Sequence, residues 1–585
     1  MYYLKSNKLF VILSLLILVL VFSAYANHFN NDFHFDDTHV IENNIFVRSI
    51  QNIPSFFTDV RTHSSIPANQ VYRPVLLSSF ALDYWAGGGL NPVFFHITSF
   101  VLYLFQGILM FLVLWKIMEV AVPHPRNRYL ALFAVGWYML NPANTESVNY
   151  IFARSEILAA LGVLGSFTLY LYVPKSRKFY LYLLPMIAGA LAKISSVIFV
   201  PLFLVYILLF ERKQSLFNIF KKSHWQPVGH TFKKVTPAFI IGVILFMFVQ
   251  YMNAPTVVRS DISFAHYIAS QPFSALHYLL SFFLPINLNA DYDWDPVTNI
   301  FDGRLIIGIA AVIFLIYLAF KYSKRLRTRP IAFGIAWFLL ALLPSSSIFP
   351  LAEVINDHRA FLPYIGLVLA IVWWLRTAIL DKKLVFQKTP LTKAGIMFLV
   401  GALLAANTIG THNRNKVWRT DEALWYDVIQ KNPQNNRGLM NYAVTQMRQG
   451  RYNVAKVYLE KSQMLNPNYP YVEANLGVVE GKLNNPAAAE MHFEQALALN
   501  PNNQSALYLY ALWLHEEGRS DEAIQKLNYL LKISPAHLNT RHLLMDIYFR
   551  QNDTARLAEI AAETLYYVPR DPVTLQYLSA IEGNR

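Results

Sequence analysis

Residues 9–37 read LFVILSLLILVLVFSAYANHFNNDFHFDD: a long apolar run is followed within a few residues by two adjacent carboxylates, Asp36 and Asp37. The run is long enough to cross a membrane. It ends in Ala24-Tyr25-Ala26, so it is either a signal anchor or a cleavable signal peptide. We favour the anchor, because an anchor would hold the acidic pair beside the bilayer.

The composition is that of a membrane protein. The chain has 585 residues, of which 55% are hydrophobic and 15% charged, with a mean hydropathy of +0.31. A soluble protein carries about 25% charged residues. The chain has no cysteine, which excludes disulfides, thiolate metal sites and cysteine nucleophiles. The net charge is +14. Because lysines and arginines of membrane proteins collect in cytoplasmic loops, this charge needs no nucleic-acid partner, and we predict none.

Apolar runs beyond the first one predict a polytopic bundle. They lie at about 92–115, 129–141, 155–173, 179–192, 194–210, 236–252, 304–320, 331–343, 360–376 and 394–410. Lysines and arginines collect in alternate loops, beginning with the tail that holds Lys5 and Lys8, and this bias places those loops in the cytoplasm. With this alternation of loops, residues 253–303 must begin and end outside the cytoplasm. The apolar stretch 272–288 therefore lies in the interface or re-enters the membrane rather than crossing it. We predict a multi-pass protein of the bacterial inner membrane, with residues 1–410 forming about eleven spans.

The C-terminal part has a repeat with a fixed period. Five prolines recur at intervals of 34 residues: Pro433, Pro467, Pro501, Pro535 and Pro569. This is the tetratricopeptide period. Small and apolar residues recur with it at Ala455, Ala489 and Ala523, and at Leu459, Phe493 and Leu527. We predict a linker and first helix over 411–435 and a repeat solenoid over 436–585, outside the cytoplasm, with a degenerate fourth repeat and a closing helix. Its concave groove would hold a peptide or an extended protein segment, or the solenoid is purely an assembly platform.

The acidic pair is the first candidate for catalysis. Adjacent side chains diverge, so one of Asp36 and Asp37 can act as a general base while the other orients it or binds a cation. The alternative is a solvated turn. Whether these acids hold a divalent cation stays open, and we favour a base that acts without a metal.

Three further clusters lie on the same predicted side of the membrane. Glu146, Arg154 and Glu156 enter or border apolar helices, where ionised groups are costly unless they are functional or, as the alternative, form an internal Arg–Glu pair. Lys193 either binds a phosphate or snorkels to the surface. The remaining candidates are Tyr72, Arg73, His358 and Arg359. His358 and Arg359 open a helix, so they form either a phosphate site or a charged interfacial cap. Acids, cations and aromatic side chains together suit glycosyl transfer from a polyprenyl-phosphate sugar at the outer face, because the acceptor hydroxyl needs a base and the departing phosphate needs cations.

Several motifs resemble those of the transmembrane-and-tetratricopeptide O-mannosyltransferases and their bacterial relatives. They are Phe35-Asp36-Asp37, Tyr72-Arg73-Pro74, Gly89-Leu90-Asn91-Pro92 with His96, Asn141-Pro142-Ala143-Asn144-Thr145-Glu146 with Arg154, Tyr278 with Pro285 to Tyr292, His358-Arg359-Ala360-Phe361-Leu362-Pro363, and Arg414 to Trp425. The resemblance covers nearly the whole chain. The chain departs from the family pattern at Asn141 and Asn144, where the family commonly has histidines, and its repeat array is short.

The resemblance implies an all-α fold, a polytopic membrane helix bundle of the glycosyltransferase C type with a C-terminal tetratricopeptide-repeat solenoid. It implies a polyprenyl-monophosphate sugar donor, inversion at the anomeric carbon, and Asp36 or Asp37 as the base. Cations at Arg73, Arg154, Lys193, His358 and Arg359 are then candidates for the donor phosphate. Glu146, Glu156 and Tyr72 are candidates for acceptor contact or support.

Two other functions remain open at the level of sequence. One is a non-enzymatic scaffold, in which the repeats dock envelope proteins and the loop acids have no role. The other is a glycan polymerase or ligase with a diphosphate-linked donor. The sugar, the acceptor protein or peptide, and the oligomeric state are not given by the residues.

Overall fold

The computed structural model describes residues 2–254, 262–346, 350–380, 390–568 and 571–583, and these residues form helices and connecting segments without a strand. The predicted all-α fold is therefore confirmed. The helices of the first part are α1 (Tyr2–Ala24), α2 (Ile53–Phe56), α3 (Pro74–Ala86), α4 (Pro92–Ala121), α5 (Asn127–Met139), α6 (Thr145–Asn149), α7 (Arg154–Tyr172), α8 (Pro174–Lys178), α9 (Leu184–Ala190), α10 (Phe199–Tyr206), α11 (Trp225–Met252), α12 (Phe264–Phe283), α13 (Gly303–Ser323), α14 (Arg329–Leu342), α15 (Phe361–Leu375) and α16 (Pro390–Val417).

Nine helical stretches in the described part of the chain are long and apolar enough to cross a membrane. They coincide with nine of the predicted spans. The other two predicted spans, 129–141 and 179–192, coincide with the shorter helices α5 and α9. The protein is thus a multi-pass membrane protein, and the number of spans stays a prediction.

Close backbone contact holds the bundle together where glycines face each other. A Cβ atom at Gly334 of α14 would lie 2.4 Å from the carbonyl oxygen of Gly366 in α15, and one at Gly366 would lie 2.5 Å from the oxygen of Gly334. Lipid gives helices no hydrophobic reason to associate, so such close packing supplies the attraction. Buried aromatic rings fill the space next to it, with Phe167 stacked on Trp337 at 5.6 Å.

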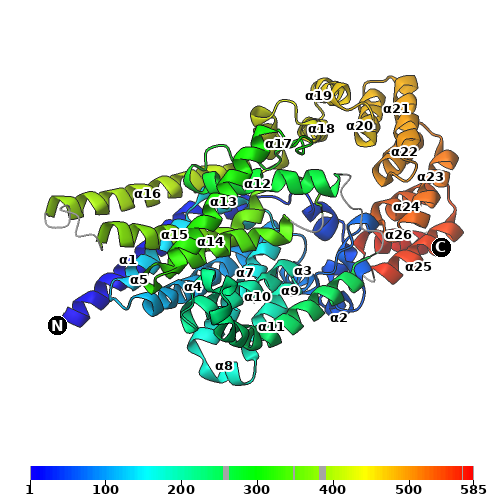
Figure 1. Cartoon of the computed structure of the whole chain (residues 1–585). Coiled ribbons are helices and arrows are strands. Elements are labelled where there is room, and N and C mark those ends of the chain that lie inside the picture. The colour runs from blue at the N-terminus through cyan, green and yellow to red at the C-terminus, as the bar shows by residue number, and fades with distance from the viewer. Residues whose placement is uncertain (1, 255–261, 347–349, 381–389, 569–570, 584–585) are drawn as a thin grey trace.

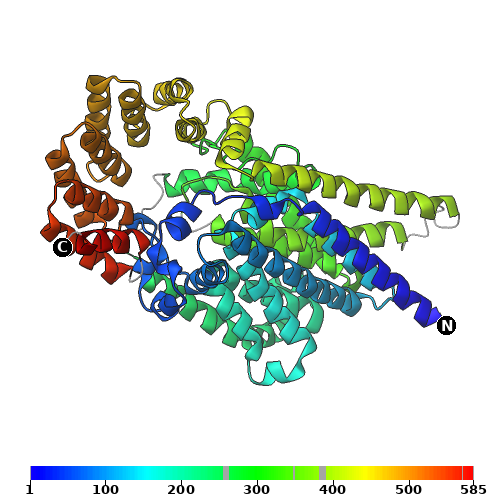
Figure 2. The same cartoon turned by 180° about the vertical axis from the view of Figure 1, so that it is seen from behind.

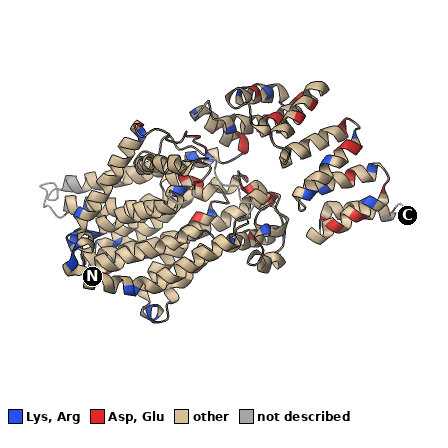
Figure 3. Ribbon diagram, turned by 45° about the vertical axis from the view of Figure 1, so that its right-hand side comes forward, with Lys and Arg blue, Asp and Glu red and all other residues tan. Residues whose placement is uncertain are grey.

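The connecting loops gather at opposite ends of the bundle. Figure 3 shows Lys and Arg positions, coloured blue on the ribbon, collected at the end of the bundle where the N-terminus lies, away from the repeats. There the Arg329 guanidinium donates to the carbonyl oxygens of Leu209 and Lys213. At the other end, Phe152 N donates to Asp37, and His28 contacts Asn149. Which of the two ends faces the cytoplasm stays a prediction.

Helix α12 contains most of the apolar stretch predicted to lie in the interface. It is not among the nine long apolar helices, and Figure 1 shows it at the end of the bundle that faces the repeats. Its side chains bond to outer-loop residues, as when Tyr278 Oη donates to the carbonyl oxygen of Asn356 at 3.0 Å. Its placement in the membrane interface stays a prediction.

The second part of the chain is a solenoid of helical hairpins. Its helices are α17 (Asp421–Lys431), α18 (Asn436–Arg448), α19 (Tyr452–Leu465), α20 (Pro470–Lys482), α21 (Pro486–Leu499), α22 (Gln504–Glu516), α23 (Ser520–Ile533), α24 (Leu538–Arg550), α25 (Thr554–Tyr567) and α26 (Pro572–Gly583). The residues that recur with the repeat period are buried as predicted: Ala455, Ala489, Ala523, Leu459, Phe493 and Leu527. Pro569 lies outside the described residues. The helices α24 and α25 lie where the fourth repeat was predicted, and α26 lies where the closing helix was predicted.

The solenoid curves over the end of the bundle that lies opposite the N-terminus. Figure 1 shows it leaving the bundle at α17, arching through α20 and α22, and returning beside α2 and α3. Figure 2 shows the same return from behind. The first loop, residues 31–73, therefore lies between the bundle and both ends of the arch.

Candidate active site

Asp36 is the accessible member of the acidic pair. Its side chain is 45% exposed, and its Oδ1 lies 3.2 Å from Nε2 of His39. Its backbone N–H donates to the hydroxyl oxygen of Tyr150 at 3.2 Å. Burial of part of the group raises its pKa, but the hydrogen bond and charge of His39 outweigh this, so the net effect lowers the pKa of Asp36. Asp36 is therefore an ionised carboxylate with an accessible oxygen.

Asp37 is buried and holds two segments together. Its Oδ2 accepts the backbone N–H of His34 at 3.0 Å, and its Oδ1 accepts that of Phe152 at 2.8 Å. Burial raises the pKa of Asp37 to about 7. Because both its oxygens are occupied by backbone donors, Asp37 orients the loop rather than facing a ligand.

The turn that separates the two carboxylates depends on Phe35. Phe35 has a φ of +52°, a left-handed conformation that is uncommon for a bulky residue. Its ring is held by neighbouring aromatic rings, with centroids 5.1 Å from Trp425 and 5.4 Å from Tyr150. Packing against Trp425 and Tyr150 thus stabilises the turn from which Asp36 projects.

Arg73 is the cation best placed to meet an anion beside Asp36. It lies just before α3, with its guanidinium 4.9 Å from the centroid of the Phe152 ring. Among the described residues, no hydrogen bond or ion pair of its guanidinium is found. The charges of Asp36 and Glu156 both act on Arg73. A ligand anion could therefore accept hydrogen bonds from Arg73 without displacing an existing partner.

Lys193 and His358 complete the group of side chains around this position, Lys193 as a second cation and His358 as a hydrogen-bonding side chain. Lys193 forms an ion pair with Glu156 at the start of α7. His358 Nδ1 lies 2.7 Å from Glu146 Oε1. Burial raises the pKa of the Glu146 carboxyl well above its usual value, so a protonated Glu146 donates to the ring nitrogen of His358. His358 and Glu146 are consequently a neutral hydrogen-bonded pair.

The other predicted site residues have structural partners. Arg154 is fully buried, pairs with Asp83 at 2.6 Å, and donates to the hydroxyl groups of Ser99 and Ser79. It is thus occupied inside the protein, as in the alternative prediction of an internal ion pair, although its predicted partners were Glu146 and Glu156.

Arg359 and Tyr72 lie at the edge of the group. Arg359 bonds to Glu353, with 3.3 Å between Nη2 and Oε2. Tyr72 is buried, and its hydroxyl group donates to the carbonyl oxygen of Phe57 at 2.9 Å. Tyr72 therefore fixes the backbone that presents Arg73.

Some residues of the site carry no signal that we recognised in the sequence. His39 follows Asp36 by three residues, and this spacing could have revealed it. Tyr150 lies between the acid and the cations, with its ring centroid 6.4 Å from that of His358. His63 is buried, and neither ring nitrogen has a hydrogen-bond partner among the described residues. No local pattern distinguishes His63 from a core histidine.

The linker and first repeat contribute to the same site. His34 contacts Asp421 Oδ1 at 2.8 Å and the carbonyl oxygen of Trp418 at 2.6 Å. Burial would lower the pKa of His34, but the Asp421 carboxylate raises it, so the imidazolium donates to both oxygens. Further along, Arg437 of α18 pairs with Asp291 at 2.6 Å and with Glu353 at 3.1 Å. The membrane bundle and the solenoid are joined at the site.

Among the described residues, no group of three His, Asp or Glu side chains comes together as metal ligands. The preference for chemistry without a metal stays a prediction.

The arrangement is that of a multi-pass helical membrane protein whose tetratricopeptide repeats pack on an outer site with one accessible acid and several cations. Tetratricopeptide-repeat family models match residues 437–469 and 475–537. They confirm the class of the C-terminal solenoid.

The predicted resemblance to the transmembrane-and-tetratricopeptide O-mannosyltransferases is also confirmed. The chain is 24% identical over 483 residues to "Protein O-mannosyl-transferase TMTC4" of Mus musculus, covering 74% of this chain and 64% of that protein. It is 24% identical over 561 residues to "Protein O-mannosyl-transferase TMTC1" of Homo sapiens, covering 88% of this chain and 61% of that protein. The chain spans about three fifths of the length of these relatives.

Two solved structures are similar over their repeats. MamA is 21% identical, with 28% of this chain and 89% of that chain covered and a TM-score of 0.21. YrrB, described as a repeat protein with an unusual peptide-binding site, is 18% identical, with 35% of this chain and 97% of that chain covered and a TM-score of 0.23. At these scores neither structure informs the arrangement of this chain.

Proposed function

We propose that this protein is a membrane glycosyltransferase that moves a sugar, mannose or another hexose, from a polyprenyl-phosphate donor to an acceptor hydroxyl. The acceptor is a Ser or Thr of a protein, and transfer takes place on the extracytoplasmic face of the bacterial inner membrane. The observation that carries this proposal is the ionised, accessible Asp36 beside Arg73, whose guanidinium has no hydrogen bond or ion pair within the described part of the chain, at the end of the bundle where the solenoid packs.

Asp36 is the general base of the proposed reaction. The acceptor O–H proton passes to the carboxylate oxygen that His39 does not occupy, while the hydroxyl oxygen attacks the anomeric carbon. The bond between that carbon and the phosphate oxygen breaks, and the phosphate leaves with the electron pair. A single displacement of this kind inverts the anomeric carbon.

The cations stabilise the leaving group. Arg73 can offer a planar pair of N–H donors to two phosphate oxygens. Lys193, which forms an ion pair with Glu156, adds a second positive charge. Neutral His358 offers a ring N–H at the edge of the group. Negative charge grows on the phosphate as the bond breaks, so these donors act more strongly in the transition state than in the ground state.

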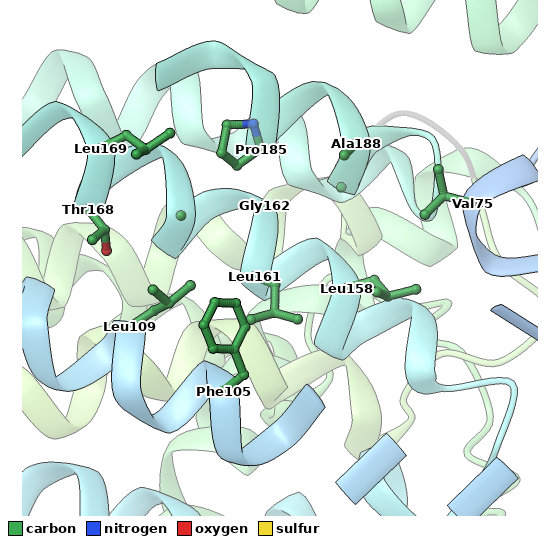
Figure 4. A pocket seen from close by; sticks show the side chains of 12 residues that line it. Val75, Phe105, Leu109, Leu158, Leu161, Gly162, Thr168, Leu169, Pro185 and Ala188 are labelled. Carbon is green, nitrogen blue, oxygen red and sulfur yellow. The ribbon is translucent and has the colours of Figure 1, made fainter. Parts of the chain in front are cut away.

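An apolar groove in the bundle supports a lipid-linked donor. The groove has a volume of about 350 Å³ and runs between α4, α7 and α9. Figure 4 shows Val75, Leu158 and Ala188 toward one end of it and Thr168 and Leu169 toward the other. Val75 lies two residues after Arg73, and its backbone N–H donates to the carbonyl oxygen of Leu191 at 3.3 Å. The groove therefore begins next to the cations.

The dimensions of the groove suit part of a polyprenyl chain. From Leu158 to Leu169 the α7 axis rises by about 16 Å, at about 1.5 Å per residue, which is about half of the ~30 Å hydrocarbon core. Every lining residue except Thr168 is apolar or glycine. A phosphate at Arg73 would thus allow the first isoprene units to follow the groove.

Sugar transfer in detergent tests the proposal. The purified full-length protein is given a panel of polyprenyl-monophosphate sugars and periplasmic proteins from a deletion strain. We expect Asp36→Asn to lower the rate by about 10²–10⁴-fold without changing the melting temperature. Asp32→Asn, which alters an exposed acid of the same loop, is the matched control and keeps activity.

The remaining outcomes separate the other functions. Equal rates for wild type and Asp36→Asn would remove Asp36 as the base. Transfer from a diphosphate-linked donor alone would make the protein a polymerase or ligase. No transfer from any donor, with proteins still captured by residues 411–585, would make it a scaffold.

A further inference from the structure

Both ends of the solenoid are attached to the membrane part. At its first end, Lys431 Nζ donates to the carbonyl oxygen of Leu288 at 2.6 Å, and Asn435 Nδ2 donates to that of Asp291 at 3.1 Å. Together with the contacts of Asp421 and Arg437, these bonds form an extended polar interface. The first end is therefore held over several residues.

The far end is held by a small apolar contact that we name the clasp. It consists of Ile45 and Phe46 of the first loop with Ala536, Leu538, Tyr567 and Val568 of the fourth repeat. Ile45, Leu538 and Val568 are buried there. A weak hydrogen bond lies beside it, from Ser534 Oγ to the carbonyl oxygen of Ser65 at 3.4 Å. The clasp is thus smaller and less polar than the first attachment.

The loop that carries Asp36 connects these two attachments. Its residues His34 and Phe35 contact the linker at the first end, and its residues Ile45 and Phe46 form the clasp at the far end. Asp36 lies between them in sequence. The first loop and the repeats together form a closed ring, and Asp36 is part of its rim.

The inner side of this ring is formed by the first helix of each repeat. Figure 1 shows α18, α20, α22 and α24 on the side of the arch nearer the bundle and α19, α21 and α23 farther from it. On α20, Tyr471 is 42% exposed, and Asn475 is partly exposed, as is Tyr508 on α22. Phenol and carboxamide groups of this kind bond to peptide backbones without requiring a particular charge.

We propose that the acceptor is an extended polypeptide segment that passes through this ring, between the inner helices and Asp36, and that the clasp opens to admit a segment flanked by folded domains. This inference rests on the proposed function. A free peptide end can thread through a closed ring, whereas an internal segment between two folded domains cannot. The clasp therefore decides which acceptors reach the base.

Cross-linking the clasp tests the proposal. The chain has no cysteine, so Ile45→Cys with Val568→Cys gives a unique pair for a short bis-maleimide. The matched control is Lys456→Cys with Glu480→Cys, which replaces an ion pair of 2.7 Å inside the solenoid and leaves the clasp free. Two acceptors share one Ser/Thr-rich sequence: a free peptide, and the same sequence between two folded domains. Phe46→Cys with Tyr567→Cys is the second clasp pair.

The expected result is a difference between the two acceptors. The cross-linked clasp lowers transfer to the flanked sequence at least tenfold and leaves transfer to the free peptide within twofold, and the control cross-link changes neither. Equal loss or equal retention for both acceptors in both clasp pairs would overturn the proposal.

A binding measurement separates this inference from the proposed function. The flanked polypeptide is mixed with the full-length protein either before or after the clasp is cross-linked, and the complex is washed at high salt. If the polypeptide is retained only when it is mixed before the clasp is cross-linked, the segment is threaded through the ring. This result does not depend on sugar transfer. Equal retention in either order contradicts the ring.

Discussion

Asp36 and Asp37 are adjacent, but their environments give them different properties. The sequence identified the pair and left their roles open, because the direction of each side chain is set by the turn at Phe35. That turn depends on Trp425 and Tyr150, which are distant in the chain. The pairing of Arg154 with Asp83 is equally non-local, so no spacing rule could have separated Arg154 from Arg73.

The pKa of Asp37 predicts how stability changes with pH. An unperturbed aspartate has a pKa near 3.9, and burial raises that of Asp37 to about 7 in the folded state. The folded state therefore binds the proton more tightly than the unfolded state. The resulting stabilisation is complete below about pH 4 and is lost as the pH rises through about 7.

We expect the melting temperature of Asp37→Asn in detergent to rise by a few degrees relative to that of the wild type between about pH 5 and about pH 8, because only the wild type loses the contribution of Asp37 over this range. Some pH dependence remains in the variant, because other groups also titrate, such as His34, whose pKa the Asp421 carboxylate raises against the effect of burial. Asp521→Asn, an exposed acid of α23, serves as the control and keeps the wild-type slope. Parallel curves for wild type and Asp37→Asn would show that Asp37 does not titrate in this range.

At the scale of elements, the apolar runs and the repeat period predicted most helices. Nine spans and the repeat hairpins coincide with helices of the structure, because hydrophobic length and a fixed period are local properties. The sequence indicates α5 and α9 less clearly, because their apolar runs are shorter than a membrane span. The groove between α4, α7 and α9 could not be predicted, because it depends on how α7 and α9 approach each other at Gly162 and Gly189.

The groove gives a prediction about the donor lipid. Ala188→Phe places a ring in the groove that Ala188 lines. Bilayer lipid is as apolar as the groove, so the lipid tail gains packing and orientation there rather than hydrophobic transfer energy. We therefore expect a modest effect, about a tenfold higher KM for a long-chain donor, which is about 1.4 kcal/mol.

Two controls accompany this measurement: a donor without a tail, and a substitution at a position outside the groove. A water-soluble sugar monophosphate donor without an isoprene unit keeps its KM in Ala188→Phe, because it has no tail to enter the groove. Ile108→Phe enlarges an exposed side chain of α4 outside the groove and leaves both values unchanged. A uniform rise in KM for both donors would argue against a tail site.

At the scale of the whole molecule, the repeats are part of the site rather than an appended domain. Sequence reasoning placed both parts on the same side of the membrane but gave no contacts between them. The joining residues, such as His34 with Asp421 and Arg437 with Asp291, are single polar pairs between distant segments.

Removing one joining residue should loosen the repeats selectively. Arg437→Ala leaves the buried Asp291 without its cation, and because Arg437 is partly exposed we expect a loss of about 1–2 kcal/mol. Hydrogen exchange should increase in α17 and α18 before it increases in the bundle. Arg550→Ala removes a surface i,i+4 pair with Asp546 and should change exchange little. Unaltered exchange at α17 and α18 in Arg437→Ala would show that the other bonds suffice.

The pair formed by His34 and Asp421 joins residues 387 positions apart in the chain, and this has a consequence for biosynthesis. A ribosome adds about 5–20 residues per second, so about 20–80 seconds separate the emergence of the first loop from that of its partner. During this interval the nascent chain has the loop of Asp36 but not the aromatic and polar partners that fix it. The candidate site therefore acquires its geometry only after the linker has been synthesised and has packed on the first loop, and a truncated translation product would carry the acidic pair without that geometry.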